Sequence, residues 1–314
     1  MIKLDDIKAA ILGHAIGDAL GVPAEFNSRS YLEKNPITDT IGYGTHHKPA
    51  GTWSDDTSMT LATLDSLASR GLDYAGLMER FIRWWKLAEY TATDEVFDIG
   101  NTTRKSLMAY DIYHIPAEDC GQSKSIDNGN GSLMRIIPII LYLNSTSCDI
   151  LDTEEKLDIV HKASALTHAH EYSKTSCGIY YFILTELISN KSMNSIKVGI
   201  EKAKIFYKNN VDTHPFKRIF NGNIEKLYAS DIMSHGYVVS TLEAALWCVM
   251  NTDNYKDCIL KAVNLGEDTD TVAAIAGGLA GVLYGVESIP ASWLNKIIRR
   301  DVIENLCEKA YAIW

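Results

Sequence analysis

Apolar residues recur every three or four positions along most of the chain, which is the spacing of one buried face of an α-helix. The first such segment places Ile7, Ile11 and Ala15 on one face, can be capped by Asp5 or Asp6, and ends at Gly21. The same spacing predicts further helices at 61–68, 74–90, 100–111, 131–143, 154–167, 171–189, 194–207, 240–250, 255–264, 270–285, 291–299 and 301–312. The sequence therefore predicts an all-α protein.

The pattern indicates one domain and no sheet. No run of β-branched residues alternating with polar ones is long enough to demand a strand, and no repeat of about 30 to 45 residues suggests a solenoid. The chain has only 7 prolines and no low-complexity linker. We therefore expect residues 1–314 to form a single compact multi-helix bundle.

Glycines are concentrated in the segment predicted as a helix over 270–285. Each of Gly277, Gly278, Gly281 and Gly285 would cost about 1 kcal/mol relative to alanine in an exposed helix. Close packing against other helices explains such an accumulation. We expect this helix to lie at the centre of the fold, with other helices packed closely around it.

Charge and composition limit the partners and the compartment. The chain carries 30 Lys and Arg against 40 Asp and Glu, a net charge of −10, which argues against nucleic acid or an anionic membrane as a partner. The 6 cysteines are far apart and form no C-x-x-C pair, as in a reduced intracellular protein. The first residues do not resemble a secretory signal, and the longest apolar stretch, 272–286, is shorter than the roughly 18 residues of a membrane span. These features predict a cytoplasmic protein.

Two short acidic segments carry the candidate chemistry: Ser54-Asp55-Asp56-Thr57 and Asp268-Thr269-Asp270-Thr271. Each precedes an apolar helical run. At the non-helical start of a helix neighbouring carboxylates can converge, and the helix dipole favours their charge. Their oxygen donors suit hard cations such as Mg²⁺, Mn²⁺ or Ca²⁺ and not a Cys/His zinc site. Two ordinary helix caps are the alternative, and the choice depends on whether the segments meet in space.

Seven motifs, in order along residues 7–286, resemble those of the ADP-ribosylglycohydrolases. They are G-H-A-I-G-D-A-L-G-V-P-A-E-F (13–26), G-T-W-S-D-D-T (51–57), D-I-G (98–100), G-N-G-S-L-M-R (129–135), T-H (167–168), G-Y-V-V with T-L-E-A-A-L-W (236–247) and N-L-G-E-D-T-D-T (264–271). The resemblance implies a compact all-α fold with a pair of Mg²⁺ or Mn²⁺ ions at the base of a cleft.

The resemblance also assigns roles to residues. It implies metal ligation by Ser54, Asp55, Asp56, Asp268, Asp270 and Thr271, with Glu25 as a further ligand or a mobile acid–base group. It implies substrate contacts from Gly100, Asn130, Gly131, Ser132, Met134 and His168, and it places Asp98 near the scissile bond.

The residues themselves leave simpler alternatives open for this second set. Gly129 and Gly131 would let backbone N–H groups approach an anion, and a helix beginning near Ser132 would offer its positive end, but an ordinary helix cap fits the same pattern. Asp98 can be read as a cap for the helix that contains Thr102.

The implied activity is hydrolysis of a bond to C1″ of the distal ribose of ADP-ribose. Such a reaction needs a water nucleophile and stabilisation of an oxocarbenium-like transition state. One cation would hold the ribose diol while a water assisted by Asp56 or Glu25 attacks C1″. The expected partners are an ADP-ribosylated protein and ADP-ribose, with an ADP-ribosyltransferase as counterpart.

The leaving group is less determined than the reaction. The T-W-S-D-D-T and N-G-S-L-M-R segments are similar to the bacterial dinitrogenase reductase-activating type, which implies ADP-ribosyl-arginine, in a regulatory or a toxin-protective role. Glu267 stands where the family often has glycine, and Ser240 where aspartate is frequent. The alternatives are hydrolysis of ADP-ribosyl-serine or another ADP-ribose conjugate, another metal-dependent hydrolase of phosphoribosyl compounds, and a non-catalytic binder that inhibits a transferase.

Overall fold

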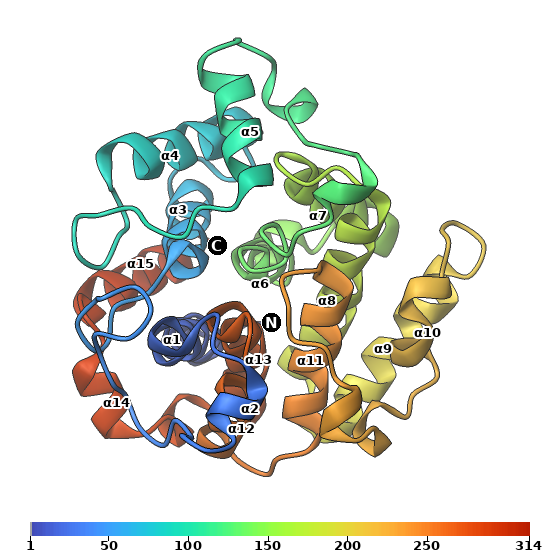
Figure 1. Ribbon diagram of the computed structural model, residues 1–314. Coiled ribbons are helices and arrows are strands. Elements are labelled where there is room, and N and C mark those ends of the chain that lie inside the picture. The colour runs from blue at the N-terminus through green and yellow to red at the C-terminus, as the bar shows by residue number, and fades with distance from the viewer. Residues whose placement is uncertain (1) are drawn as a thin grey trace.

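Helices dominate the computed structural model, which describes residues 2–314 (Figure 1). The α-helices are α1 (Leu4–Gly21), α2 (Arg29–Leu32), α3 (Asp55–Arg70), α4 (Tyr74–Leu87), α5 (Asn101–Asp111), α6 (Ile137–Leu143), α7 (Thr153–Ala165), α8 (Glu171–Ser189), α9 (Met193–Tyr207), α10 (Lys217–Phe220), α11 (Val238–Met250), α12 (Tyr255–Val263), α13 (Thr269–Tyr284), α14 (Ala291–Lys296) and α15 (Arg300–Ile313). Within this described range β-structure is limited to two isolated bridges. The predicted all-α fold is confirmed.

Helices α1 and α13 lie side by side near the centre and touch through their backbones (Figure 1). A Cβ atom added at Gly13 would come within 2.4 Å of the Gly277 carbonyl oxygen, and one added at Gly281 within 2.0 Å of the Ala9 carbonyl oxygen. Real Cβ atoms do not approach so closely, so only glycine permits this contact. The packing predicted for the 270–285 glycines is confirmed, except that Gly285 ends α13 with a φ of 85°.

The same contact fixes where the chemistry-bearing ends of these helices lie. A Cβ atom on Gly21, the last residue of α1, would lie 2.3 Å from the Cα atom of Asp270 in the first turn of α13. Thr269 reinforces the contact by donating its hydroxyl to the Gly21 carbonyl at 2.8 Å. None of the helices described between residues 2 and 314 is both long and apolar enough to cross a membrane.

The helix predicted over 131–143 begins only at Ile137. Residues 131–135 form turns instead, and Pro138 stands in the first helical turn, where its missing N–H group costs nothing. Arg135 is buried in that turn segment and donates to the Thr167 hydroxyl at 2.7 Å. The expectation of a helix start near Ser132 was therefore wrong.

One carboxylate joins three parts of the chain at the far end of α3. Asp65 accepts from Arg80 Nε of α4 and Tyr90 Oη, each at 2.9 Å, and from Lys309 Nζ of α15 at 2.8 Å. Burial acts to raise the pKa of Asp65, but these donors outweigh it and lower the pKa to about 2.

The depressed pKa of Asp65 predicts an acid-dependent contribution to stability. Asp65→Asn is expected to lower the free energy of unfolding at pH 7 by about 2 kcal/mol, because charged hydrogen bonds are lost. The contribution is present above the unfolded-state pKa near 4 and is lost as the pH falls towards 2, so the two proteins converge in acid. Urea unfolding at several pH values measures this, with the exposed Asp253→Asn as control; a difference that does not shrink in acid contradicts it.

The contact between α1 and α13 gives a second stability prediction. Gly277→Ala forces a methyl group onto the Gly13 carbonyl oxygen, which would lie only 2.2 Å away, so we expect a loss of about 3 kcal/mol or failure to fold. Gly100→Ala is the matched control, since no atom outside its chain neighbours lies within 4 Å of the new methyl group. Equal melting temperatures for the two variants would show that the helices can separate at little cost.

Candidate active-site cleft

Asp18 of α1 holds the first acidic segment at the start of α3. Its carboxylate accepts from the backbone N–H groups of Ser54 and Thr57, at 2.9 and 3.0 Å, and from the Thr57 hydroxyl at 2.6 Å. Ser54 is the N-cap of α3, and its hydroxyl accepts from the Asp56 N–H at 3.3 Å. Asp55 and Asp56 follow in the first turn, where the helix dipole favours their charge.

The second acidic segment is held by a side chain from the G-N-G turn. Asn130 donates one amide N–H to Asp268 Oδ2 at 2.8 Å and the other to the Thr241 hydroxyl at 3.1 Å. Asp268 is the N-cap of α13, and Asp270 and Thr271 lie in its first turn. The G-N-G turn and the start of α13 therefore form one hydrogen-bonded unit.

The two acidic segments, 215 positions apart in the chain, meet in space. The Thr271 hydroxyl donates to Asp56 Oδ1 at 3.3 Å. Carboxylate oxygens of Asp18, Asp56 and Asp270 all lie within 4.8 Å of one another, as do those of Glu25, Asp268 and Asp270. The meeting on which the sequence interpretation depended is present.

Burial and mutual repulsion disfavour the charged forms of these acids in the ion-free protein. Burial raises the pKa of Asp55, Asp56 and Asp270 well above the usual value, and neighbouring carboxylates add to the effect. Burial also raises the pKa of Asp268, against the opposing hydrogen bond from Asn130. Among residues 2–314, no basic side chain provides these acids with a positive counter-charge.

The donor set fits hard divalent cations. All the convergent atoms in the two acidic segments are carboxylate or hydroxyl oxygens. Within residues 2–314, Asp270 Oδ2 is buried and has no hydrogen-bond partner. A buried carboxylate oxygen without a donor is costly unless a cation compensates it. These acidic residues therefore form a site suited to a hard divalent cation.

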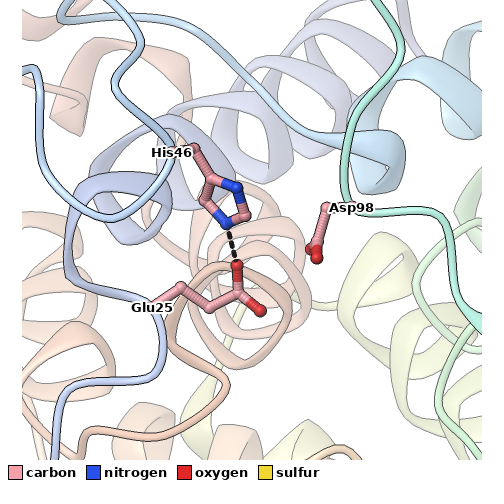
Figure 2. Close-up of side chains that lie close together, drawn as sticks. All are labelled: Glu25, His46 and Asp98. Carbon is pink, nitrogen blue, oxygen red and sulfur yellow. Dashed lines mark hydrogen bonds and ion pairs between the residues drawn. The ribbon is translucent and has the colours of Figure 1, made fainter.

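Glu25, His46 and Asp98 converge above this cluster, each from a loop (Figure 2). His46 Nε2 forms a hydrogen bond with Glu25 Oε2. Burial raises the pKa of Glu25 to about 10 and that of Asp98 to about 7, and repulsion from nearby carboxylates contributes to both. Asp98 has a φ of 61° and does not cap the next helix, whose N-cap is Gly100. The reading of Asp98 as a helix cap is wrong.

A cleft of about 240 Å³ opens between the two groups of acids. Its wall includes the predicted residues Glu25, Asp55, Asp98, Gly100, Asn130, Gly131, Met134, His168, Asp268 and Thr271. Asp56 and Asp270 lie beneath its floor and are buried. Ser132 does not line the cleft, because its hydroxyl is buried and accepts from Ser164 at 2.9 Å.

His168 forms the wall behind the glycine turn. Its Nδ1 bonds to the Thr167 hydroxyl at 2.7 Å, and burial lowers its pKa to about 3, so the ring is neutral. A Cβ atom on Gly131 would lie 2.8 Å from His168 Cε1, which explains the glycine there. A larger cavity of about 570 Å³ lies away from this cleft, beside Lys204 and Lys217, and none of the acidic clusters found in residues 2–314 lines it.

Two residues of the site, Asp18 and His46, were not predicted from the sequence. Asp18 lies within a motif that was noticed, and its place between Gly17 and Gly21 is a signal, because a carboxylate in a closely packed helix needs donors nearby. His46 gave no signal, since it lies in a loop 21 positions after its partner. Glu267 has a φ of 63°, which explains why glycine is often found at its position.

The fold and this cleft define an α-helical protein with a site suited to divalent cations. The chain belongs to the ADP-ribosylglycohydrolase family, whose model matches residues 2–314. It is accordingly a glycosidase that acts on ADP-ribosyl compounds.

Curated relatives and a solved structure are similar to this protein over almost the whole chain. "ADP-ribosylarginine hydrolase Tri1" of Serratia proteamaculans is 37% identical, with 98% of this chain and 80% of the relative covered. "ADP-ribosyl-[dinitrogen reductase] glycohydrolase" of Rhodospirillum rubrum is 32% identical, with 95% and 94% covered. A solved structure described as an "ADP-ribosylglycohydrolase-related protein complex" superposes with a TM-score of 0.82 at 28% identity, covering 99% of this chain and 98% of that one.

The capping role of Asp18 can be tested by a single substitution. In Asp18→Asn an amide NH₂ replaces one acceptor oxygen and faces N–H donors, so we expect a loss of about 2 kcal/mol in unfolding free energy and weaker Mn²⁺ binding. Chemical denaturation and isothermal titration measure the two effects. Asp5→Asn, an exposed acid on the same helix, is the control, and unchanged values for Asp18→Asn would contradict the assignment.

Proposed function

We propose that the protein removes ADP-ribose from arginine side chains of modified proteins by hydrolysing the N-glycosidic bond at C1″. The observation that carries this proposal is the convergence of two acidic segments on the floor of a cleft whose wall is the G-N-G turn. The arginine linkage is supported by the names of two relatives as ADP-ribosylarginine hydrolases, the second being 34% identical and from Pseudomonas putida.

The acidic segments would hold two Mg²⁺ or Mn²⁺ ions. The proposed ligands are Ser54, Asp55, Asp56, Asp268, Asp270 and Thr271. Of these, Ser54 already accepts the Asp56 N–H, so its hydroxyl keeps a second lone pair for an ion. When bound, such ions would lower the pKa of a water molecule and orient the ribose hydroxyls.

The chain's own groups would manage the protons and the substrate. With ions bound to offset the repulsion that raises their pKa in the ion-free protein, the Asp56 or Glu25 carboxylate would take a proton from the water that attacks C1″. The Asp98 carboxyl, whose pKa burial raises to about 7, would face the leaving nitrogen and can hold a proton there. Backbone N–H groups of the Gly129–Gly131 turn would face the substrate phosphates, and His168 the adenosine side.

The biological setting follows from the substrate. Removing ADP-ribose reverses a modification that an ADP-ribosyltransferase installs, so a transferase is the proposed counterpart. The relative named for dinitrogen reductase supports a regulatory role, and protection against a modifying toxin needs the same reaction. The proposed site of action is the cytoplasm.

The decisive test is release of ADP-ribose from ADP-ribosyl-arginine with Mg²⁺, with Mn²⁺ and with EDTA. Replacing both Asp55 and Asp56 by Ala is expected to lower kcat by at least about 1,000-fold, because electrostatic stabilisation and ion binding are both lost. The matched control is another pair of consecutive acids, the exposed Glu118 and Asp119, replaced together by Ala.

The other outcomes separate the alternatives. Full turnover in EDTA, or by the Asp55/Asp56 variant, would overturn the cation-dependent mechanism. Turnover of ADP-ribosyl-serine in a parallel assay, without turnover of the arginine conjugate, would replace the proposed leaving group. Tight binding of ADP-ribose with no turnover of either conjugate would indicate a binder.

A further inference from the structure

The loop formed by residues 43–48 is hydrogen-bonded to the backbone that carries Glu25. Thr45 donates its N–H to the Pro23 carbonyl at 3.1 Å and its hydroxyl to the Glu25 carbonyl at 2.6 Å. A Cβ atom on Gly44 would lie 1.9 Å from the Pro23 carbonyl oxygen, so the two backbones are in direct contact. The loop thus has a fixed position relative to Glu25.

The same loop reaches the segment that carries Asp98. Lys48 pairs with Glu95, and its ammonium group lies 5.2 Å from the ring centre of Phe97. The Tyr43 N–H donates to the Lys48 carbonyl at 2.7 Å, and this hydrogen bond closes the loop. Loop 43–48 therefore bridges the two loops that supply acids to the upper side of the cleft.

His46 lies at the centre of this bridge (Figure 2). Its ring centre is 5.0 Å from that of Phe97 and 5.9 Å from that of Phe26, and its Nε2 meets Glu25 Oε2. The aromatic contacts fix the ring, so the nitrogen that faces Glu25 is held in one place. Such fixed second partners are what orient a reactive carboxyl.

The acids around Glu25 oppose its position in the cleft, so a hydrogen-bond partner such as His46 is needed to hold it there. The nearby charges are carboxylates, those of Asp98, Asp268 and Asp56, and they repel an ionised Glu25. Glu25 also lies on a loop and not in a helix, so repulsion favours rotamers of its ionised side chain that point away from the other acids. An imidazole attracts a carboxyl group whether the shared proton lies on nitrogen or oxygen.

We propose that His46 is a positioning residue that keeps the Glu25 carboxyl turned towards Asp98 and Asp268 for the hydrolytic step. The role rests on the proposed function, because it acts through a group that the reaction uses. His46 itself does not line the cleft and is not expected to touch the substrate.

The test compares two substitutions of similar size. His46→Leu keeps apolar contact with Phe26 and Phe97 but removes the hydrogen bond, and His46→Gln keeps an amide that can donate or accept. We expect His46→Leu to lower kcat for ADP-ribosyl-arginine about 10- to 100-fold with KM changed less than about 3-fold, and His46→Gln to stay within about 3-fold of the parent. The exposed neighbour His47, replaced by Asn because its φ is 54°, is the control.

A cycle of variants separates positioning from a general structural effect. If His46 acts through Glu25, adding His46→Leu to Glu25→Gln lowers kcat no further than Glu25→Gln alone. Additive losses would overturn the proposal, as would equal losses for His46→Leu and His46→Gln. Should His46→Leu fail to fold, His46→Met, which also lacks a nitrogen to bond Glu25, replaces it in the same cycle.

A crystal structure of each His46 variant provides a readout that does not depend on turnover. In His46→Leu the Glu25 carboxyl is expected to rotate away from Asp98 or to occupy several rotamers, while in His46→Gln it stays in place. An unchanged Glu25 in His46→Leu would overturn the proposal. If the parent protein does not cleave ADP-ribosyl-arginine, the proposed function fails, and the crystal structures still decide whether His46 positions Glu25.

Discussion

Repulsion among buried carboxyl groups is the constraint on which this structure depends. Asp18, Asp55, Asp56 and Asp270 are buried within one region, Asp268 is half-buried beside them, and no basic side chain of residues 2–314 belongs to these groups. Bringing such groups together opposes folding, so the scaffold that converges them must be stable without their help. The apolar core and the helix contacts supply that stability. Four of the acids lie at helix starts, where backbone N–H groups and dipoles reduce the cost, and Asp18, in the last turn of α1, accepts N–H groups from the start of α3.

The contact between α1 and α13 determines where the acidic residues of the site lie relative to one another. Glycines at four-residue intervals on α1 face small residues on α13, and this row ends where Gly21 touches Asp270. One turn before that end, Asp18 binds the start of α3. A single helix therefore sets the distance between two segments that the sequence separates by more than 200 residues.

Much of this could be predicted from the sequence, and the exceptions have physical causes. Long amphipathic helices and the glycine-rich α13 are encoded by local periodicity, and adjacent hydroxyls and carboxylates mark the acidic segments. The turn at 131–135 looked helical because its apolar residues have helical spacing, but the buried Arg135 ties it to Thr167 instead. His46 acts through a contact between two loops, and no local pattern encodes such a contact. Asp18 is buried in a helix, and only the tertiary structure shows which N–H groups it accepts.

The two sides of the cleft differ in how they are built. The lower acids belong to the first turns or caps of α3 and α13, whereas Glu25, His46 and Asp98 all lie on loops. Loop backbones fluctuate more than helix ends that are packed into a core. Because loop 43–48 joins the loops of Glu25 and Asp98, any change in the width of the cleft would move the upper acids as one group, while the spacing of the lower oxygens stays constant.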